Sequence, residues 1–237
     1  MFCGMIMTKK LAILQSNYIP WKGYFDLINM VDEFILFDEV QYTRKDWRNR
    51  NRIKTRNGSM WLTIPVKVKG KYFQRIEDTV ISDPKWYRRH WESIVHSYSK
   101  AGFFHIYREL FEDLYLTAKE KSLSDINYRF LTAICKLLEI HTKISWSADY
   151  NTAQGKTKRL VDLCKQAGAS EYISGPAARS YIDEKLFKKE GVCVRYMDYS
   201  GYPEYNQLYP PFDHAVTILD LIFNEGPKTK KFMKTFK

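Results

Sequence analysis

The sequence predicts an α/β fold with a Rossmann-like, mostly parallel sheet and a helical insert at about residues 84–140. Short apolar runs alternate with amphipathic segments on both sides of that insert, which is the pattern of β-α units. Within the insert, apolar residues recur at three- and four-residue spacing, which is typical of amphipathic helices. We therefore predict one composite domain, with an N-terminal α/β half (1–83), the insert (84–140) and a C-terminal α/β half with a basic tail (141–237).

The expected elements follow from local patterns of apolar and turn-forming residues. Before the insert we predict strands at 11–15, 34–40 and 61–66 and a helix at 23–30, with Pro65 favouring an edge position for the third strand. Asp83 and Pro84 are a helix start, and the helices of the insert are expected to end near 102, 114 and 138. After the insert, strands are expected at 143–146, 171–174 and 192–197, and helices at 157–167, 183–189 and 215–224.

Composition limits the classes of function. Hydrophobic residues make up 45% of the 237 residues, and no apolar run approaches the roughly 20 residues that span a bilayer, so no membrane insertion is expected. The four cysteines are widely spaced and no secretion signal is recognisable, which favours reduced thiols in a cytoplasmic protein. His90, His96 and His105 do not share a helix face at metal-ligand spacing, so no metal site is expected.

The net charge of +11 is concentrated in two segments. Residues 41–60 carry seven Lys/Arg and one Asp, a net +6, and residues 228–237 carry five Lys, a net +5. For the tail, a frayed solubilising terminus and an anion-binding segment are both open. In the first segment the cations are interleaved with aromatic and amide side chains, which suits recognition of phosphate, sugar or base.

Polar side chains follow several of the expected strands. Gln15 and Asn17 follow the first strand, Asp38 and Gln41 the second, and Ser174-Gly175 a later one. Because the carboxyl ends of parallel strands meet at one edge of a sheet, a ligand site is expected there. We predict catalytic roles for Asp38, Gln15 and Asn17. The predicted substrate-binding residues are Tyr18, Trp21, Gly23, Tyr24, Gln41, Tyr42, Arg44, Trp47, Arg48, Asn49, Arg50, Ser174, Gly175 and Arg179.

Common catalytic motifs do not occur. Gly155-Lys156-Thr157 resembles the end of a phosphate-binding P-loop, but the first Gly of that motif would fall at Tyr150. GxGxxG, GxSxG and HExxH are all missing from the sequence, and a Cys/His nucleophile pair is neither indicated nor excluded.

Four stretches carry a resemblance to the WbqC-like family, and together they extend it over Leu11 to Pro227. They read LAILQSNYIPWKGYFDLI, DEVQYTRKDWRNRNRIKT, KRLVDLCKQAGASEYISGPAARSYIDEKLF and TILDLIFNEGP. Ser16 departs from the family pattern, which usually has Pro after the Gln. The family is associated with bacterial gene clusters for O-antigen and other surface polysaccharides, so the resemblance implies a cytoplasmic enzyme that tailors a nucleotide-linked amino sugar.

A more distant resemblance, at the level of the fold, is to the nucleotidylyltransferase superfamily. In that superfamily an HxGH-type loop at a helix start holds the ATP phosphates. The corresponding quartet here is Trp21-Lys22-Gly23-Tyr24, in which the Gly matches and both His are absent.

The resemblance leaves three hypotheses for function. In the first, an aminoacyl (for example glycyl) or acyl group passes from a preactivated donor such as aminoacyl-tRNA to the sugar amine. Asp38 would be the base, Gln15, Asn17 and Asn49 the oxyanion donors, and Arg44, Arg48 and Arg50 the phosphate ligands. In the second, an amide ligase first activates the acid with ATP as an adenylate. In the third, the protein is a binding module for a nucleotide sugar or RNA without catalysis. ATP or charged tRNA would thus be a substrate rather than a bound cofactor.

Overall fold

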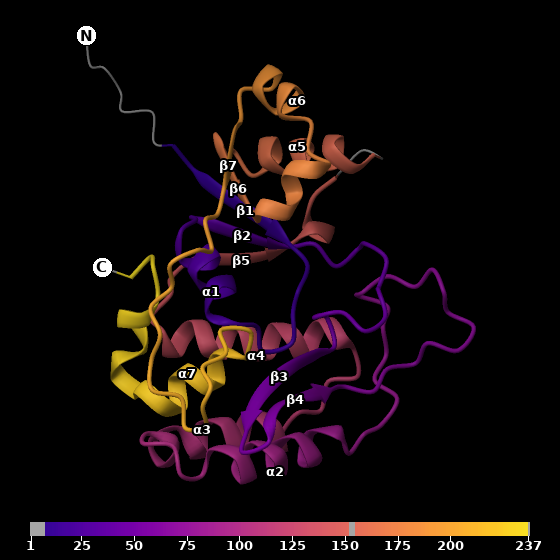
Figure 1. The fold of residues 1–237 in the computed structure, drawn as a ribbon. Helices are drawn as coiled ribbons and strands as arrows, with labels where there is room; N and C mark the ends of the chain where they lie inside the picture. Colours follow the sequence, from indigo (N-terminus) through magenta and orange to yellow (C-terminus); the bar gives the residue numbers. More distant parts are fainter. Residues whose placement is uncertain (1–7, 152–154, 237) are drawn as a thin grey trace. The chain divides into compact units, whose positions relative to one another are not determined.

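The computed structural model describes residues 8–151 and 155–236, and these form two compact units (Figure 1). The sheet unit comprises the described residues up to 14, with 27–37 and 141–200. The helical unit comprises residues 15–26, 38–140 and those from 201 onward. Both units are therefore assembled from segments that are distant in the sequence, and their boundaries differ from the three predicted parts.

The sheet unit holds one five-stranded sheet in which every neighbouring pair is parallel, as predicted. The strand order is β5-β2-β1-β6-β7. In chain order within this sheet that is 3-2-1-4-5, the arrangement of a doubly wound fold, with its switch point between β1 and β6. The strands are β1 (Lys10–Leu14), β2 (Glu33–Leu36), β5 (Lys143–Trp146), β6 (Glu171–Ser174) and β7 (Cys193–Tyr196).

The central strands are buried, which explains their continuous apolar sequences. Leu11 of β1 pairs with Tyr172 of β6, and both side chains are at most 1% exposed. Tyr172 stacks on Phe187 with ring centroids 5.2 Å apart. Phe187 lies in α6 (Glu184–Lys189), and α5 (Lys156–Gln166) adds Leu163 to the same core. Two short 3-10 turns, η1 (Ser147–Asp149) and η2 (Pro176–Ser180), complete the connections of this unit.

One carboxylate is buried at the amino end of β2. Glu33 accepts hydrogen bonds from Lys9 at 2.7 Å, Ser145 at 2.6 Å and Tyr150 at 2.5 Å, and forms an ion pair with Lys143 at 2.9 Å. Burial would raise the pKa of Glu33, but these four partners outweigh it and lower that pKa to about 2. Glu33 is therefore a charged anchor of the sheet unit.

The helical unit contains the predicted insert as three helices, α2 (Trp86–Tyr98), α3 (Phe104–Leu116) and α4 (Leu123–Leu137). Near the C-terminus α7 (Ile218–Glu225) is followed by the 3-10 segment η3 (Gly226–Phe232). Phe223 of α7 contacts Tyr98, Phe104 and Phe111, with ring centroids 5.1–5.3 Å apart. The aromatic residues at helical spacing are thus core residues that join α7 to the insert.

Two regions differ from the sequence prediction. The predicted third strand is β4 (Gly58–Thr63), but it pairs antiparallel with β3 (Arg50–Thr55) in a separate two-stranded sheet. The turn between them places Gly58 at φ 102°, a conformation that glycine adopts without steric cost. The basic tail is not frayed through residue 236, because Thr229 and Met233 are buried and the Lys234 and Thr235 amides donate to the Asp26 carboxylate, each at 3.0 Å.

Helix α1 (Lys22–Asn29) begins in the helical unit and ends in the sheet unit. None of the helices within residues 8–151 and 155–236 has the length and hydropathy that crossing a bilayer requires.

Candidate functional site

A cavity of about 270 Å³ opens in the helical unit. Small-molecule sites are typically about 300–1,000 Å³, so this one suits a single small ring rather than a whole nucleotide sugar. Three segments line it: the turn 15–21 that follows β1, the residues from 47 to 51, and the segment 213–215. The lining residues are Asn17, Pro20, Trp21, Trp47, Asn51, His214 and Ala215.

Arg48 fixes the amide side chains of the turn. Its guanidinium donates to Oε1 of Gln15 at 3.0 Å and to Oδ1 of Asn17. Because only the oxygen of an amide can accept from a guanidinium, the NH₂ group of each side chain points away from Arg48. In the part of the chain that the structure describes, those NH₂ groups have no hydrogen-bond partner, and that of Asn17 is available as a donor at the cavity.

Asn51 holds the backbone of the same turn. Its Nδ2 donates to the carbonyl oxygens of Ile19 at 2.8 Å and Tyr18 at 3.2 Å. The amide of Tyr18 in turn donates to the Trp47 carbonyl at 3.1 Å. Ile19 has φ 35°, which is strained for a β-branched residue and persists where the surroundings enforce it. Asn51, a buried polar residue of β3, therefore shapes the cavity wall.

Gly23 makes room for the indole of Trp21. A Cβ atom at Gly23 would lie 2.3 Å from Cζ2 of that indole, well inside contact distance. On another side the indole meets Tyr202 edge to face, with ring centroids 5.4 Å apart. The glycine matching the nucleotidylyltransferase quartet is thus explained here by packing against a cavity residue.

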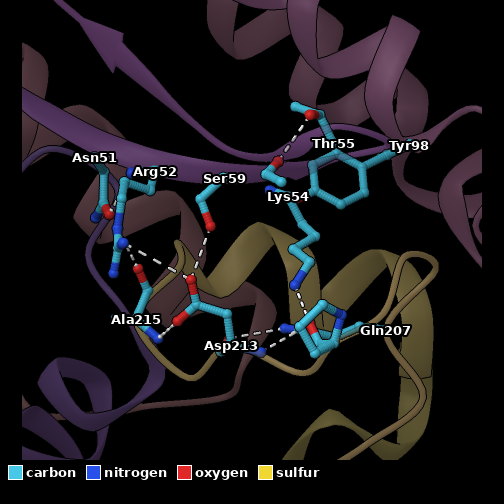
Figure 2. A network of polar contacts seen from close by, with 11 residues as sticks. Asn51, Arg52, Lys54, Thr55, Ser59, Tyr98, Gln207, Asp213 and Ala215 are labelled. Atoms are coloured by element: carbon cyan, nitrogen blue, oxygen red, sulfur yellow. Dashed lines mark hydrogen bonds and ion pairs between the residues drawn. The ribbon is translucent and has the colours of Figure 1, made fainter.

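Hydrogen bonds hold Asp213 and Ala215, the two neighbours of His214 in the sequence (Figure 2). The Asp213 carboxylate accepts from Ser59 Oγ and from the Ala215 amide, each at 2.8 Å. The side-chain amide of Gln207 bonds both the N–H and the carbonyl of Asp213, each at 2.8 Å. Arg52 reaches the Ala215 carbonyl at 2.9 Å, so β3 and β4 together fix the position of His214.

The imidazole of His214 is exposed and lines the cavity. Its ring meets Phe212 edge to face at 4.6 Å, and no described residue hydrogen-bonds to its nitrogens. Partial burial, reinforced by the charge of Lys22, lowers the pKa of His214 below its ordinary value. This shift favours the neutral form of the ring, which can accept a proton.

Asp38, the predicted base, lies in a buried network instead of on the cavity wall. It is 1% exposed, and its carboxylate accepts from the Ser16 amide at 2.8 Å, from Ser16 Oγ at 2.6 Å and from Ser124 Oγ. Asn127 donates to Ser16 Oγ at 2.9 Å. This geometry favours a role in positioning the turn, and the role of base stays an untested prediction. Ser16 supplies two donors here, whereas the Pro expected from the family pattern would have neither.

The model of the WbqC-like protein family matches residues 15–232, a range that contains every residue lining the cavity. The chain belongs to the WbqC-like protein family. It is also 50% identical over 226 residues to the uncharacterized protein Rv1507c of Mycobacterium tuberculosis (strain ATCC 25618 / H37Rv), which covers 95% of this chain and 98% of that protein. No solved structure matches it significantly.

Several predicted binding residues of this WbqC-like protein are buried supports. Tyr18 bonds Tyr115 at 2.7 Å and His90 at 2.9 Å, and Tyr24 donates to the Gln15 carbonyl at 2.8 Å. Within the helical unit, the predicted binding residues Tyr18, Tyr24, Tyr42 and Asn49 are each at most 6% exposed. They hold the cavity segments in place and do not offer a surface to a ligand.

Of the predicted cationic residues, Arg50 contributes to an aromatic surface next to the cavity, in which the two indoles are exposed. Arg50 stacks over Trp61 at 4.1 Å, and Trp61 lies 5.3 Å from Trp47, which lines the cavity. We call Arg50, Trp61 and Trp47 the Trp–Arg surface. Of the other predicted residues, Arg44 donates to the Val68 carbonyl and Gln41 to the Tyr72 carbonyl, each at 3.0 Å, so both brace a neighbouring loop.

Ser174, Gly175 and Arg179 belong to the sheet unit, and the cavity is lined without them. Ser174 is 5% exposed and accepts a hydrogen bond from Tyr172 at 3.2 Å, while Arg179 stacks 4.7 Å over Tyr196. Their predicted assembly with Gln15 and Asp38 at one sheet edge is not part of this cavity.

Sequence reasoning did not select His214, Asn51 or Pro20 for the site. The available signal for His214 was its position at the end of a Pro- and Tyr-rich loop, directly before a helix, where functional side chains are frequent. Among the described residues, no group of three or more His, Cys, Asp or Glu is placed to hold a metal ion.

Proposed function

We propose that this WbqC-like protein transfers an aminoacyl or acyl group to the amine of a nucleotide-linked amino sugar, in the synthesis of a bacterial surface polysaccharide such as O-antigen. The observation that carries the proposal is the cavity itself. It combines two indoles, an amide donor on Asn17 and the neutral, exposed imidazole of His214.

In this proposal the cavity binds the sugar, and the Trp–Arg surface binds the nucleotide. The indoles of Trp21 and Trp47 offer broad apolar faces to the sugar ring, which the cavity volume can accept. The nucleotide extends over the Trp–Arg surface, where Arg50 binds phosphate and the exposed Trp61 stacks on a base.

The chemistry requires one base and one oxyanion donor. The neutral amine of the sugar attacks the carbonyl carbon of the donor ester while its proton passes to His214. The NH₂ group of Asn17 donates to the oxygen that becomes negative. The ester C–O bond then breaks, and the imidazolium returns the proton to the leaving alkoxide oxygen, so that an amide and an alcohol are formed.

His214 suits the role of base better than Asp38 in this scheme. Its imidazole reaches the cavity and has no protein partner among the described residues, whereas the Asp38 carboxylate already accepts three hydrogen bonds. A base must be able to reach the proton that it removes.

The reaction is tested by supplying alternative donors. Purified protein is incubated with a nucleotide-linked 4-amino sugar and either glycyl-tRNA or glycine with ATP, and products are identified by mass spectrometry. Amide formation with glycyl-tRNA alone is expected. Release of AMP without tRNA would instead establish the adenylate route. Tight, salt-dependent RNA binding with no turnover of any amino sugar would establish a binding module.

His214 is tested by substitution. His214→Ala is expected to lower kcat by at least about 100-fold, the usual contribution of a general base, with binding of the nucleotide sugar nearly unchanged. His105→Ala replaces another exposed histidine of the helical unit and is expected to leave kcat unchanged. An unaltered rate in His214→Ala would show that His214 is not the base.

A further inference from the structure

The two most exposed large hydrophobic residues of the described chain are neighbours in a single loop. Tyr72 is 72% exposed and Phe73 is 81% exposed. Both lie in residues 66–75, part of the long irregular connection between β4 and α2 (Figure 1). We call this segment the 66–75 loop.

Hydrogen bonds hold the 66–75 loop at its base. The Lys67 amide donates to the Val80 carbonyl at 2.8 Å, and Gln74 Nε2 donates to the Lys67 carbonyl at 2.9 Å. The Tyr42 amide donates to the Gln74 carbonyl at 2.9 Å. Gln41 and Arg44 add side-chain donors to the Tyr72 and Val68 carbonyls. The loop is thus a braced projection that holds its aromatic residues away from the core.

Positive charge surrounds the aromatic pair. The 66–75 loop contains Lys67, Lys69, Lys71 and Arg75 and no acidic residue. Arg75 forms an ion pair with Glu77 at 2.8 Å, whereas the three lysines are exposed and form no ion pair within residues 8–151 and 155–236. An exposed apolar tip with unpaired cations beside it is complementary to a surface that has an anionic outer layer over an apolar interior.

We propose that the 66–75 loop docks the protein onto an anionic lipid bilayer. Phe73 and Tyr72 enter the interfacial layer, where aromatic rings are favoured, and the three lysines contact the lipid phosphates. Each lysine near such a surface strengthens binding about fivefold. Docking of this kind requires no spanning helix, and it goes beyond acyl transfer because it does not depend on the reaction catalysed.

The geometry of the aromatic pair favours lipid over nucleic acid. The rings of Tyr72 and Phe73 meet edge to face at 4.9 Å and 85°, so they form one compact apolar wedge. Sites that bind bases combine aromatic stacking with guanidinium groups on the rings. The Trp–Arg surface has this arrangement, with Arg50 over Trp61, whereas no cation stacks on the rings of Tyr72 or Phe73 in the described part of the chain.

Co-sedimentation of the full chain with vesicles tests the proposal. Binding to vesicles that contain phosphatidylglycerol is expected to exceed binding to pure phosphatidylcholine vesicles by at least about tenfold, and to weaken at high salt. The double variant Tyr72→Ser with Phe73→Ser, and the triple variant Lys67→Gln, Lys69→Gln and Lys71→Gln, should each lose at least about tenfold in binding.

Matched controls come from the sheet unit. Tyr181→Ser removes another exposed aromatic residue, and Lys185→Gln, Lys188→Gln and Lys189→Gln together remove three exposed lysines. Both controls should bind vesicles as the unmodified chain does. Equal binding to neutral vesicles, or full binding by the loop variants, would overturn the proposal. So would a short RNA whose binding depends on the same loop residues and displaces the protein from vesicles.

Discussion

At the scale of single residues, access decides which ionisable group can do chemistry. Asp38 follows a strand and carries the charge that a base needs, but its oxygens are occupied by Ser16 and Ser124. His214 has no such partners among the described residues and lines the cavity. A sequence displays residue type and spacing, but it does not display which lone pairs are already occupied, and for this reason it pointed to Asp38.

The pH dependence of the reaction should report on His214 and Lys22. Because the pKa of His214 lies below 6.5, kcat/KM should rise with pH in the acidic range and level off by neutral pH. Lys22→Met removes a cation that disfavours the imidazolium, so the pKa of His214 should rise. The acidic limb of the profile should therefore move to higher pH in that variant.

Comparing the pH profile of Lys22→Met with that of the unmodified chain requires a control for the loss of one positive charge. Lys100→Met removes an exposed cation elsewhere in the helical unit and should leave the limb in place. Lys22 itself has a pKa of about 8, lowered by burial against the opposing effects of Asp26 and Asp220, so it stays charged throughout the acidic limb. If the acidic limb did not move in Lys22→Met, the group that titrates in it would not be His214.

At the scale of elements, the turn 15–21 depends on its neighbours for its shape. Arg48 holds its amide side chains, Asn51 holds its carbonyl oxygens, and Gly23 accommodates the indole of Trp21. Arg48 and Asn51 act from positions distant in the sequence, and Gly23 acts by close packing. The cavity wall is thus specified by contacts rather than by the secondary structure of the turn.

Gly23→Ala tests that dependence. The new methyl group displaces the Trp21 indole, so binding of the nucleotide sugar should weaken by about tenfold, a cost within the range for overpacking. Helix α1 itself should not be weakened, because alanine favours a helix by about 1 kcal/mol over glycine. Isothermal titration calorimetry measures the binding and thermal unfolding the stability.

The effect of Gly23→Ala should act through Trp21 alone. In a double-mutant cycle, adding Gly23→Ala to Trp21→Ala should therefore cause little further loss of binding. Gly102→Ala, where the added methyl group meets only the Asn224 carbonyl at 3.9 Å, is a matched control. A further tenfold loss on the Trp21→Ala background would mean that the methyl group disturbs something other than the indole.

The elements with clear periodicity could be predicted from the sequence. Helices α2, α3 and α4 bury apolar residues at three- and four-residue spacing, and the sheet strands are apolar runs between helices, so their patterns were sufficient. Strand β3 was missed because the side chains that it turns inward include Asn51, whose amide caps carbonyl oxygens in the core. Because Asn is typical of loops, a buried Asn that is retained for its hydrogen bonds leads to the prediction of a loop instead of a strand.

At the scale of the whole molecule, each unit contains a buried ionisable group that makes the fold sensitive to acid in its own range of pH. In the helical unit His90 is 7% exposed, accepts from Tyr18 at Nδ1 and donates from Nε2 to the Thr63 carbonyl at 3.1 Å. Burial lowers the pKa of His90 to about 4 from its ordinary 6.5. In the sheet unit the pKa of Glu33 is lowered to about 2 from its ordinary 4.5.

These shifts affect stability in separate ranges of pH. As pH falls from 6.5 to 4, the unfolded chain protonates His90 before the folded chain does, so the free energy of unfolding decreases by about 3 kcal/mol in total. Glu33 stabilises the folded state above 4.5, and that contribution is lost only as pH falls from 4.5 toward 2. At pH 5, which lies within the His90 range and above the Glu33 range, the helical unit should therefore be weakened while the Glu33 contribution to the sheet unit is intact.

Hydrogen exchange followed by mass spectrometry can resolve the two units in the intact chain. Between pH 7 and pH 5, after correction for intrinsic exchange rates, peptides from α2 and α4 should lose about 2 kcal/mol of opening free energy, whereas peptides from β1 and β2 should lose little. His90→Gln cannot take up a proton, so the pH-dependent loss in the helical unit should shrink in that variant to the smaller contribution of His214, whatever its stability at pH 7. Equal losses in both units, or a loss of unchanged size in His90→Gln, would show that another group makes the protein sensitive to acid.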